Sequence, residues 1–238
     1  AMLKLRVLTW DVKDTLLRLR RPVGQSYAAA ARAQGLRVPP EELERAFRAA
    51  YGAQSQRCPN YGRGQGLGSR RWWLAVVKET FRLAGASDEG ALELLAEHLY
   101  RDFCGAGNWE ELPGAAETLE RCRQRGFRMG VVSNFDERLE DILHRCRMRH
   151  HFDFVLTAEA TGFAKPDRRM FERALSLGGV PPELAAHVGD DYTRDYRAAR
   201  AVGMHGFLLR AAGRGLEPGV PPEHVLPTLS HLLPRIQK

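Results

Sequence analysis

Three apolar, strand-like segments of this 238-residue chain each end at a polar residue that can take part in chemistry. These residues are Asp11, Ser133 and Asp190. From about residue 114 onward such segments alternate with helical patterns, which predicts a parallel sheet with helices on both faces. Ligands of these sheets bind beyond the carboxyl ends of the strands. We therefore expect the three residues to meet at one site.

The segment between the first strand and this alternating region lacks strand patterns, so we predict an all-helical insertion. Residues 18–105 are assigned to this cap, and residues 1–17 and 106–238 to an α/β core with a Rossmann-like parallel sheet. The cap should contain helices over 40–52, 69–84 and 87–103. In the core we expect strands over 5–11, 127–132, 152–157, 185–189 and 205–209, and helices over 114–125, 167–177 and 191–202.

A stretch of the cap from Arg57 to Gly68 contains four glycines and no regular periodicity. Its spacing does not match a dinucleotide-binding GxGxxG motif, and no strand precedes it. We therefore expect a flexible loop. Arg63 lies within this loop, where its guanidinium can either bind an anionic ligand or belong to a solvated surface.

Composition limits the class of protein. No apolar run approaches the roughly 20 residues that a membrane helix needs, and the N-terminal segment lacks a secretory layout. We expect a soluble, intracellular, cytoplasmic protein with no membrane partner; no organelle or protein partner is indicated. The formal net charge of +7 is not gathered into runs, so a nucleic-acid partner is not expected. The four cysteines form no CxxC pair, which favours buried thiols over disulfides or a zinc site.

Four segments together resemble the four motifs of the haloacid dehalogenase superfamily, and they occur in the same order and at similar spacing. The resemblance implies an aspartate-based hydrolase whose core carries a C1-type helical cap. The four segments are Trp10-Asp11-Val12-Lys13-Asp14-Thr15-Leu16, Val131-Val132-Ser133-Asn134, Lys165-Pro166-Asp167 and Val188-Gly189-Asp190-Asp191, the last followed by Asp195.

The resemblance also implies a role for each site residue. Asp11 would be the nucleophile that accepts a phosphoryl group, and Lys165 would neutralise the charge that gathers around it. Mg²⁺ would be the cofactor, and a small phosphorylated metabolite the substrate. Phosphate oxygens would contact Ser133, Asn134, Lys165 and Arg63, and the metal ligands would be Asp11, the backbone carbonyl of Lys13, Asp190 and Asp195, the last as a ligand or an orienting residue.

The chain departs from the family pattern directly after the nucleophile. Phosphatases of the family carry a second Asp two residues on, which protonates the leaving oxygen and then activates water; Lys13 occupies that position here. The next residue, usually Gly, is Asp14. Lys13 is a poor acid or base near pH 7, and its ammonium can compete with Mg²⁺ by pairing with Asp11 or Asp190. Asp14 can replace the missing acid–base group only if its side chain points into the site.

Three functions remain open at this point. The first is a slow or narrowly specific Mg²⁺-dependent phosphatase that forms an aspartyl-phosphate on Asp11. The second is a catalytically impaired binding protein that keeps the hydrolase fold. The third is a dehalogenase, since that branch of the superfamily also lacks the second Asp; it does not need the metal-binding acidic pair Asp190 and Asp195, which argues against it.

Overall fold

The computed structural model describes residues 2–211, 213, 215 and 217–238, and its contacts divide the chain into two compact units. We call them the sheet unit and the helical unit. Position 1 and positions 212, 214 and 216, which fall within the predicted core ranges, lie outside the described residues. The sheet unit comprises Ala1–Arg18, Glu111–Phe135 and Cys146–Lys238, and the helical unit comprises Leu19–Glu110 and Asp136–Arg145.

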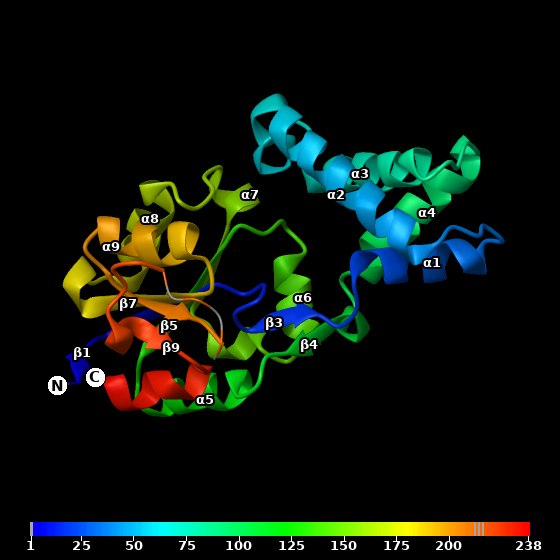
Figure 1. Cartoon of the computed structure of the whole chain (residues 1–238). Helices are drawn as coiled ribbons and strands as arrows, with labels where there is room; N and C mark the ends of the chain where they lie inside the picture. The colour runs from blue at the N-terminus through cyan, green and yellow to red at the C-terminus, as the bar shows by residue number, and fades with distance from the viewer. Residues whose placement is uncertain (1, 212, 214, 216) are drawn as a thin grey trace. The chain divides into compact units, whose positions relative to one another are not determined.

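A six-stranded parallel sheet forms the centre of the sheet unit (Figure 1). Its strand order is β6-β5-β2-β7-β8-β9. All four residues of β2 (Val7–Trp10) are buried, as expected for a parallel strand covered on both faces. The register pairs Thr9 of β2 with Gly130 on one side and His187 on the other. The other strands are β5 (Arg128–Ser133), β6 (Phe154–Thr157), β7 (Ala185–Gly189), β8 (His205–Leu209) and β9 (Val225–Leu226).

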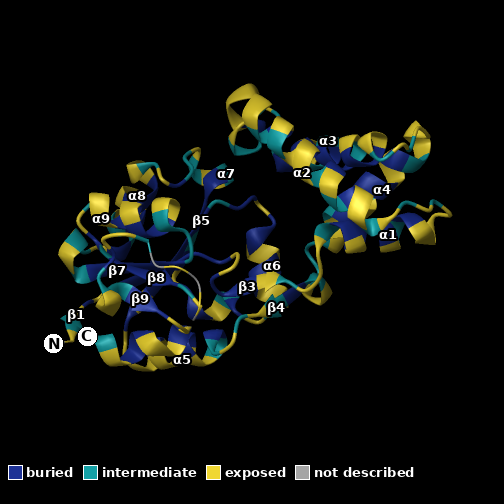
Figure 2. Cartoon of the chain, in the orientation of Figure 1, coloured by how far each residue is buried: buried dark blue, intermediate teal, exposed yellow. Residues whose placement is uncertain are grey.

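Helices cover both faces of this sheet, which confirms the predicted α/β class. Helices α8 and α9 lie on one side, and α5 with the turn η7 lies on the other (Figure 1). The α8 side buries Met170 and Phe171 against Val132, and the strands between the layers are the most deeply buried part of the unit (Figure 2). The helical elements are α5 (Ala115–Gln124), η3 (Arg149–His151), α7 (Ala158–Thr161), α8 (Arg168–Gly178), η4 (Pro182–Leu184), the π-helical turn η5 (Tyr192–Arg197), α9 (Ala198–Ala201), η6 (Pro222–His224) and η7 (Leu229–Arg235).

Two short strand pairs complete the architecture. Strands β1 (Leu3–Lys4) and β10 (Ile236–Gln237) pair in parallel, so the two ends of the chain lie side by side (Figure 1). Strands β3 (Leu17–Leu19) and β4 (Trp109–Glu111) pair where the chain passes between the two units. The sequence analysis did not predict these strands, because two or three residues are too short to show a periodic pattern.

The helical unit packs its helices around an apolar centre that includes Tyr27, Leu43, Phe81 and Leu95. Residues 136–145, which the sequence analysis had grouped with the core, belong to this unit by their contacts. Its elements are α1 (Val23–Ala33), α2 (Pro40–Arg57), η1 (Asn60–Gln65), α3 (Ser69–Leu83), α4 (Glu89–Asp102), η2 (Ala106–Asn108) and α6 (Leu139–Arg145).

The stretch expected as an irregular loop has regular parts. Arg57 is the last residue of α2, and residues 60–65 form the 3-10 helix η1. The backbone N–H of Leu67 donates to the carbonyl of Gly62 at 3.0 Å, and the indole Nε1 of Trp72 donates to the carbonyl of Cys58 at 2.8 Å. Hydrogen bonds therefore hold this segment, although its sequence shows no apolar periodicity.

Two compositional expectations can be compared with the described residues. No described helix is both long and apolar enough to cross a membrane. All four cysteines are free thiols, but only Cys122 is buried, whereas Cys58, Cys104 and Cys146 are partly exposed. The expectation of buried thiols therefore holds for one of the four.

Candidate active site

The candidate nucleophile Asp11 follows β2 directly and lies at the carboxyl edge of the sheet. Its backbone N–H donates to the carbonyl of Val188 at 2.9 Å, which extends the pairing of β2 with β7 by one residue. The Asp11 side chain is 12% exposed, and its Oδ1 accepts a hydrogen bond from Lys165 Nζ at 2.8 Å. Burial raises the pKa of Asp11, although the Lys165 ammonium acts in the opposite direction. Asp11 is thus a buried carboxylate held beside one cation.

Lys165 reaches the site from the segment before α8. Each proton of its ammonium has an acceptor: Asp11 Oδ1, Asp195 Oδ1 at 2.6 Å and the carbonyl oxygen of Val132 at 2.9 Å. Burial opposes the charged form, but the two carboxylates raise the pKa of Lys165. Lys165 is therefore a fixed positive charge and not a base.

Asp195, in η5, is engaged at both carboxylate oxygens. Oδ1 accepts from Lys165 and lies 2.9 Å from Nε2 of His187, and Oδ2 accepts from the backbone N–H of Asp191 at 3.1 Å. Burial alone would favour its neutral form, but Lys165 and His187 hold the pKa of Asp195 far below its usual range. A side-chain carbon at Gly189 would lie 2.2 Å from Asp195 Cγ, so the carboxylate fits only because that residue is glycine. These contacts favour the orienting role that the sequence left open for Asp195.

Asp190 forms no ion pair with any residue of the described ranges 2–211, 213, 215 and 217–238. Its Oδ1 accepts a hydrogen bond from the hydroxyl of Thr15 at 3.2 Å. Burial raises the pKa of Asp190 to about 6, and the neighbouring carboxylates of Asp11, Asp195 and Asp14 add to the shift. Oxygen atoms of Asp11, Asp190 and Asp195 lie within 4.8 Å of one another, so this group can hold a metal ion.

The structure answers two questions about Lys13 and Asp14. The Lys13 ammonium pairs with Asp14 Oδ2 at 2.6 Å, and not with Asp11 or Asp190, the pairing that the sequence left possible. Both side chains are 49% exposed. Asp14 adopts a left-handed backbone with φ of 65°, the conformation that explains the usual glycine at this position. Asp14 therefore directs its carboxylate to the Lys13 ammonium, which weakens its case as the acid–base group.

The second motif lies at the end of β5. Ser133 is buried there, in register with Thr157 of β6. Asn134 uses its side-chain amide on the backbone of Lys165: Nδ2 donates to the Lys165 carbonyl at 2.8 Å, and Oδ1 accepts from the Lys165 N–H at 2.6 Å. Asn134 therefore positions Lys165, and direct phosphate binding by Ser133 and Asn134 stays a prediction.

The sequence analysis also named Arg63, Asp191 and the backbone carbonyl of Lys13. Arg63 lies in η1 of the helical unit, so the sheet unit by itself does not bring it to the site. Asp191 caps η5 by accepting from the backbone N–H groups of Thr193 and Arg194. The metal role of the Lys13 carbonyl stays a prediction.

The sequence analysis missed three residues of the site: Thr9, Thr15 and His187. Thr15 lies inside the first motif, and this position alone could have placed it near the site. Thr9 and His187 interrupt otherwise apolar strands, and a buried polar residue in such a run signals a hydrogen-bonded partner. Only the strand register shows that this partner is the other residue of the pair.

Comparison with known proteins gives the family. A model of the haloacid dehalogenase-like hydrolase family matches residues 5–203. Haloacid dehalogenase-like hydrolase domain-containing protein 3 of Bos taurus is 57% identical over 238 residues, covering 98% of this chain and 94% of that protein. The chain therefore belongs to the haloacid dehalogenase-like hydrolase family, which confirms the resemblance found in its motifs.

Solved structures show the same fold at low sequence identity. The 2-haloacid dehalogenase from Pseudomonas syringae pv. Tomato DC3000 aligns with a TM-score of 0.71 and 22% identity over 97% of each chain. A HAD phosphatase from Thermococcus onnurineus aligns with a TM-score of 0.68 and 20% identity, over 98% of this chain and 100% of that chain. One fold thus carries two different chemistries, so the reaction has to be argued from the site.

Proposed function

We propose that the protein is a slow Mg²⁺-dependent phosphatase that acts on a small phosphorylated metabolite through an aspartyl-phosphate on Asp11. The observation that carries this proposal is the placement of Lys165 between Asp11 and Asp195, with Asp190 beside them. A buried carboxylate held by a fixed cation, next to a second carboxylate that can take a metal ion, suits phosphoryl transfer better than simple ligand binding.

The residues supply the first chemical step as follows. Lys165 holds Oδ1 of Asp11, so we assign the attack on phosphorus to Oδ2. The new bond joins Oδ2 to phosphorus, and the bond from phosphorus to the leaving oxygen breaks with its electron pair on that oxygen. Lys165 offsets the negative charge on the carboxylate and on the transferred group. In the second step, water attacks the aspartyl-phosphate, releases inorganic phosphate and regenerates Asp11.

The residues of the site fit a magnesium ion. Among the described residues, three carboxylates (Asp11, Asp190 and Asp195) lie around the one ammonium of Lys165, a net charge of −2 that would repel a phosphate dianion. Burial, and after it the negative charges of Asp11, Asp195 and Asp14, raise the pKa of Asp190 to about 6. We assign the metal to Asp11, Asp190 and the Lys13 carbonyl, because Asp195 already accepts hydrogen bonds at both oxygens. When bound, Mg²⁺ supplies positive charge to the carboxylates and the phosphoryl oxygens, which are ligands it prefers.

The absence of an Asp at position 13 explains why turnover should be slow. No acidic side chain there can protonate the leaving oxygen or activate water, and loss of such a group costs about 10²–10⁴ in rate. The Lys13–Asp14 ion pair occupies the loop that would otherwise carry the group. Substrates whose leaving oxygen is stable as an anion need no proton, so we expect the protein to prefer them.

The same ion pair favours a second candidate function, a binding protein that keeps the fold and has lost turnover. In that case a phosphorylated ligand would still contact Lys165 and a bound metal, but no product would form. A dehalogenase is less consistent with the site, because halide displacement does not need the metal-binding carboxylate that Asp190 can supply.

A panel of phosphorylated metabolites and aryl phosphates, assayed for phosphate release with Mg²⁺ and with chelator, separates these candidates. We expect Mg²⁺-dependent release from at least one compound and its loss in Asp11→Asn. Beryllium fluoride should bind the wild type in the presence of Mg²⁺ and fail to bind Asp11→Asn. Beryllium fluoride binding without any turnover supports the binding protein, and turnover that survives Asp11→Asn overturns the nucleophile assignment.

A further inference from the structure

Two polar residues lie opposite each other in the middle of the parallel sheet. Thr9 of β2 and His187 of β7 are register partners, and both are fully buried. The other residues of these two strands are apolar or glycine. Burial of a hydroxyl and an imidazole costs free energy unless both form hydrogen bonds. Thr9 Oγ1 lies 2.8 Å from Nδ1 of His187, so the two residues satisfy each other.

The other ring nitrogen of His187 points to the site. Nε2 lies 2.9 Å from Asp195 Oδ1, and an ionised carboxylate only accepts, so Nε2 carries the proton. Burial lowers the pKa of His187, which favours the neutral ring. In a neutral ring with its proton on Nε2, Nδ1 is an acceptor. The Thr9 hydroxyl has one proton and two acceptors in reach, Nδ1 at 2.8 Å and the Ala186 carbonyl at 3.4 Å, and we assign its donation to the nearer one. The sheet therefore selects one tautomer of His187.

This donor reaches the oxygen that also holds Lys165. Asp195 Oδ1 accepts from Lys165 Nζ at 2.6 Å as well as from His187 Nε2, and Lys165 in turn donates to Asp11 Oδ1. A carboxylate that accepts one hydrogen bond at each oxygen can still rotate about its Cβ–Cγ bond. A second, rigid donor to one of these oxygens restricts that rotation. His187 belongs to a central strand, and its fully buried ring lies edge-to-face against Phe171.

We propose that His187, oriented by Thr9, is a positioning residue that fixes the carboxylate of Asp195 and thereby holds the Lys165 ammonium against Asp11. The ring nitrogens of His187 hydrogen-bond Asp195 and Thr9, not the candidate nucleophile, so we assign its positioning effect to Asp195. The catalytic consequence rests on the proposed phosphoryl transfer at Asp11, whereas the positioning of Lys165 does not.

A matched pair of amide variants tests the role of the Nε2 donor. In His187→Gln, the amide N–H lies at about the reach of Nε2 and can still donate to Asp195. In His187→Asn, the amide is one methylene shorter and reaches only the Thr9 side. Loss of an outer hydrogen-bond partner typically lowers activity by about 10–100-fold. We expect a loss of this size in kcat for His187→Asn, with KM nearly unchanged, and recovery of most of it in His187→Gln.

A second readout follows Lys165 without any turnover. The chain has five lysines, and Lys165 is the one held by three acceptors in a buried position. In ¹⁵N-lysine-labelled protein we expect one slowly exchanging ammonium signal, absent in Lys165→Met. The signal should broaden or vanish in His187→Asn and persist in His187→Gln. Thr9→Val, which replaces the hydroxyl with a methyl group of similar size, should weaken the signal less than His187→Asn does.

The outcomes separate the two proposals. If the wild type hydrolyses no substrate but the ammonium signal behaves as expected, the proposed function fails and the positioning role stands. If His187→Asn keeps both kcat and the ammonium signal of the wild type, the positioning role is overturned. Equal losses in the Gln and Asn variants also overturn it, because they indicate that His187 only fills space. If His187→Asn does not fold, Thr9→Val and His187→Gln are compared with the wild type instead. An ammonium signal that is unchanged in Thr9→Val but lost in His187→Gln contradicts the positioning role.

Discussion

The ammonium of Lys13 lies 2.6 Å from Oδ2 of Asp14, and this exposed ion pair takes up the two side chains that follow the nucleophile loop. The ion pair of Lys13 is therefore with Asp14, and not with Asp11 or Asp190. The carboxylate of Asp14 is engaged by the same pair, so it is not free to act as an acid or base. An exposed pair of this kind contributes about 0–1 kcal/mol to stability. Its removal should therefore change the chemistry of the loop much more than the stability of the fold.

The double variant Lys13→Asp/Asp14→Gly should raise phosphatase activity. The new Asp supplies a group that can protonate the leaving oxygen, and glycine adopts the left-handed backbone of position 14 without strain. The increase in kcat/KM should approach the roughly 10²–10⁴ typical of general acid–base catalysis. The measurement is Mg²⁺-dependent hydrolysis of an aryl phosphate by the wild type, the two single variants and the double variant.

Lys13→Ala is the control for this experiment, because it removes the ammonium without adding an acid. It should leave turnover near the wild-type value. Because the two substitutions act through one loop, their effects should not add. A double variant that folds and binds Mg²⁺ but is no faster than the wild type would mean that other parts of the site have also diverged. A large loss of activity in Asp14→Ala would instead identify Asp14 as the acid–base group.

Activity of the wild type should depend strongly on the leaving group. Without an acid at position 13, the leaving oxygen departs as an anion, so the rate should rise as the pKa of the leaving alcohol or phenol falls. A series of substituted phenyl phosphates measures this slope. The slope should flatten in Lys13→Asp/Asp14→Gly, where protonation becomes available. Equal slopes in the two proteins would contradict the assignment of position 13 as the missing acid.

The parts of the site that the sequence predicted are those encoded locally. Asp11, Ser133 and Asp190 each close a short apolar run, and such runs in an α/β pattern end at one edge of the sheet. The α/β fold class was predicted from the same alternation. The short strands β3 and β9 were not predicted, because they have too few residues to show a period.

Contacts between distant residues were not predictable in the same way. The role of Asp195 depends on Lys165, 30 residues away, and on the space left by Gly189. The pairing of Lys13 with Asp14 depends on a backbone angle that glycine normally supplies. Side-chain partners follow from register and local geometry, which residue patterns restrict but do not define. The sequence therefore predicts which residues lie near the site better than which atoms they bind.

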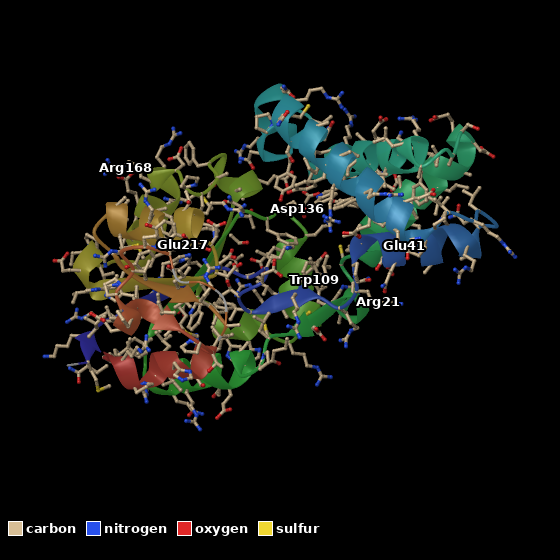
Figure 3. The ribbon with its side chains drawn as sticks, in the orientation of Figure 1. Arg21, Glu41, Trp109, Asp136, Arg168 and Glu217 are labelled. Atoms are coloured by element: carbon tan, nitrogen blue, oxygen red, sulfur yellow. The ribbon has the colours of Figure 1, made fainter. Side chains whose placement is uncertain are left out.

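The segment after the second motif carries a buried ion pair whose loss should destabilise the helical unit. The carboxylate of Asp136, labelled in Figure 3, accepts from Arg138 Nε at 2.9 Å and Nη2 at 2.7 Å and from Trp73 Nε1 at 2.7 Å. The Asp136 and Arg138 side chains are only 1% and 9% exposed. Asp136→Ala leaves the guanidinium buried without its partner, which typically costs about 3–5 kcal/mol.

Urea unfolding measures this loss. The control is Glu172→Ala, which breaks an exposed pair with Arg168 and should cost less than about 1 kcal/mol. Similar costs for Asp136→Ala and Glu172→Ala would show that burial does not strengthen the Asp136–Arg138 pair.

The last prediction concerns Asp190 and the pH dependence of stability without metal. Folding raises the pKa of Asp190 from its ordinary 3.8 to about 6, so the folded state binds more protons than the unfolded state between these values. Stability is therefore highest below pH 3.8 for this group and falls as the pH rises through 6. Since one pKa unit corresponds to about 1.4 kcal/mol, the loss at neutral pH should reach at most about 3 kcal/mol.

Asp190→Asn cannot titrate, so in chelator its stability relative to the wild type should rise between pH 4.5 and pH 7.5, the window set by the shift to about 6. Urea unfolding at both pH values measures the difference. Mg²⁺ should then reverse the order at pH 7.5, because it stabilises the folded wild type by binding and the variant has lost a ligand. Glu89→Gln is a control of opposite sign: Arg82 lowers the pKa of Glu89, so that variant should lose stability relative to the wild type as the pH rises. If Asp190→Asn gains nothing between the two pH values, the carboxylate is not under strain in the folded protein. If it also keeps the full stabilisation by Mg²⁺, Asp190 is not a metal ligand.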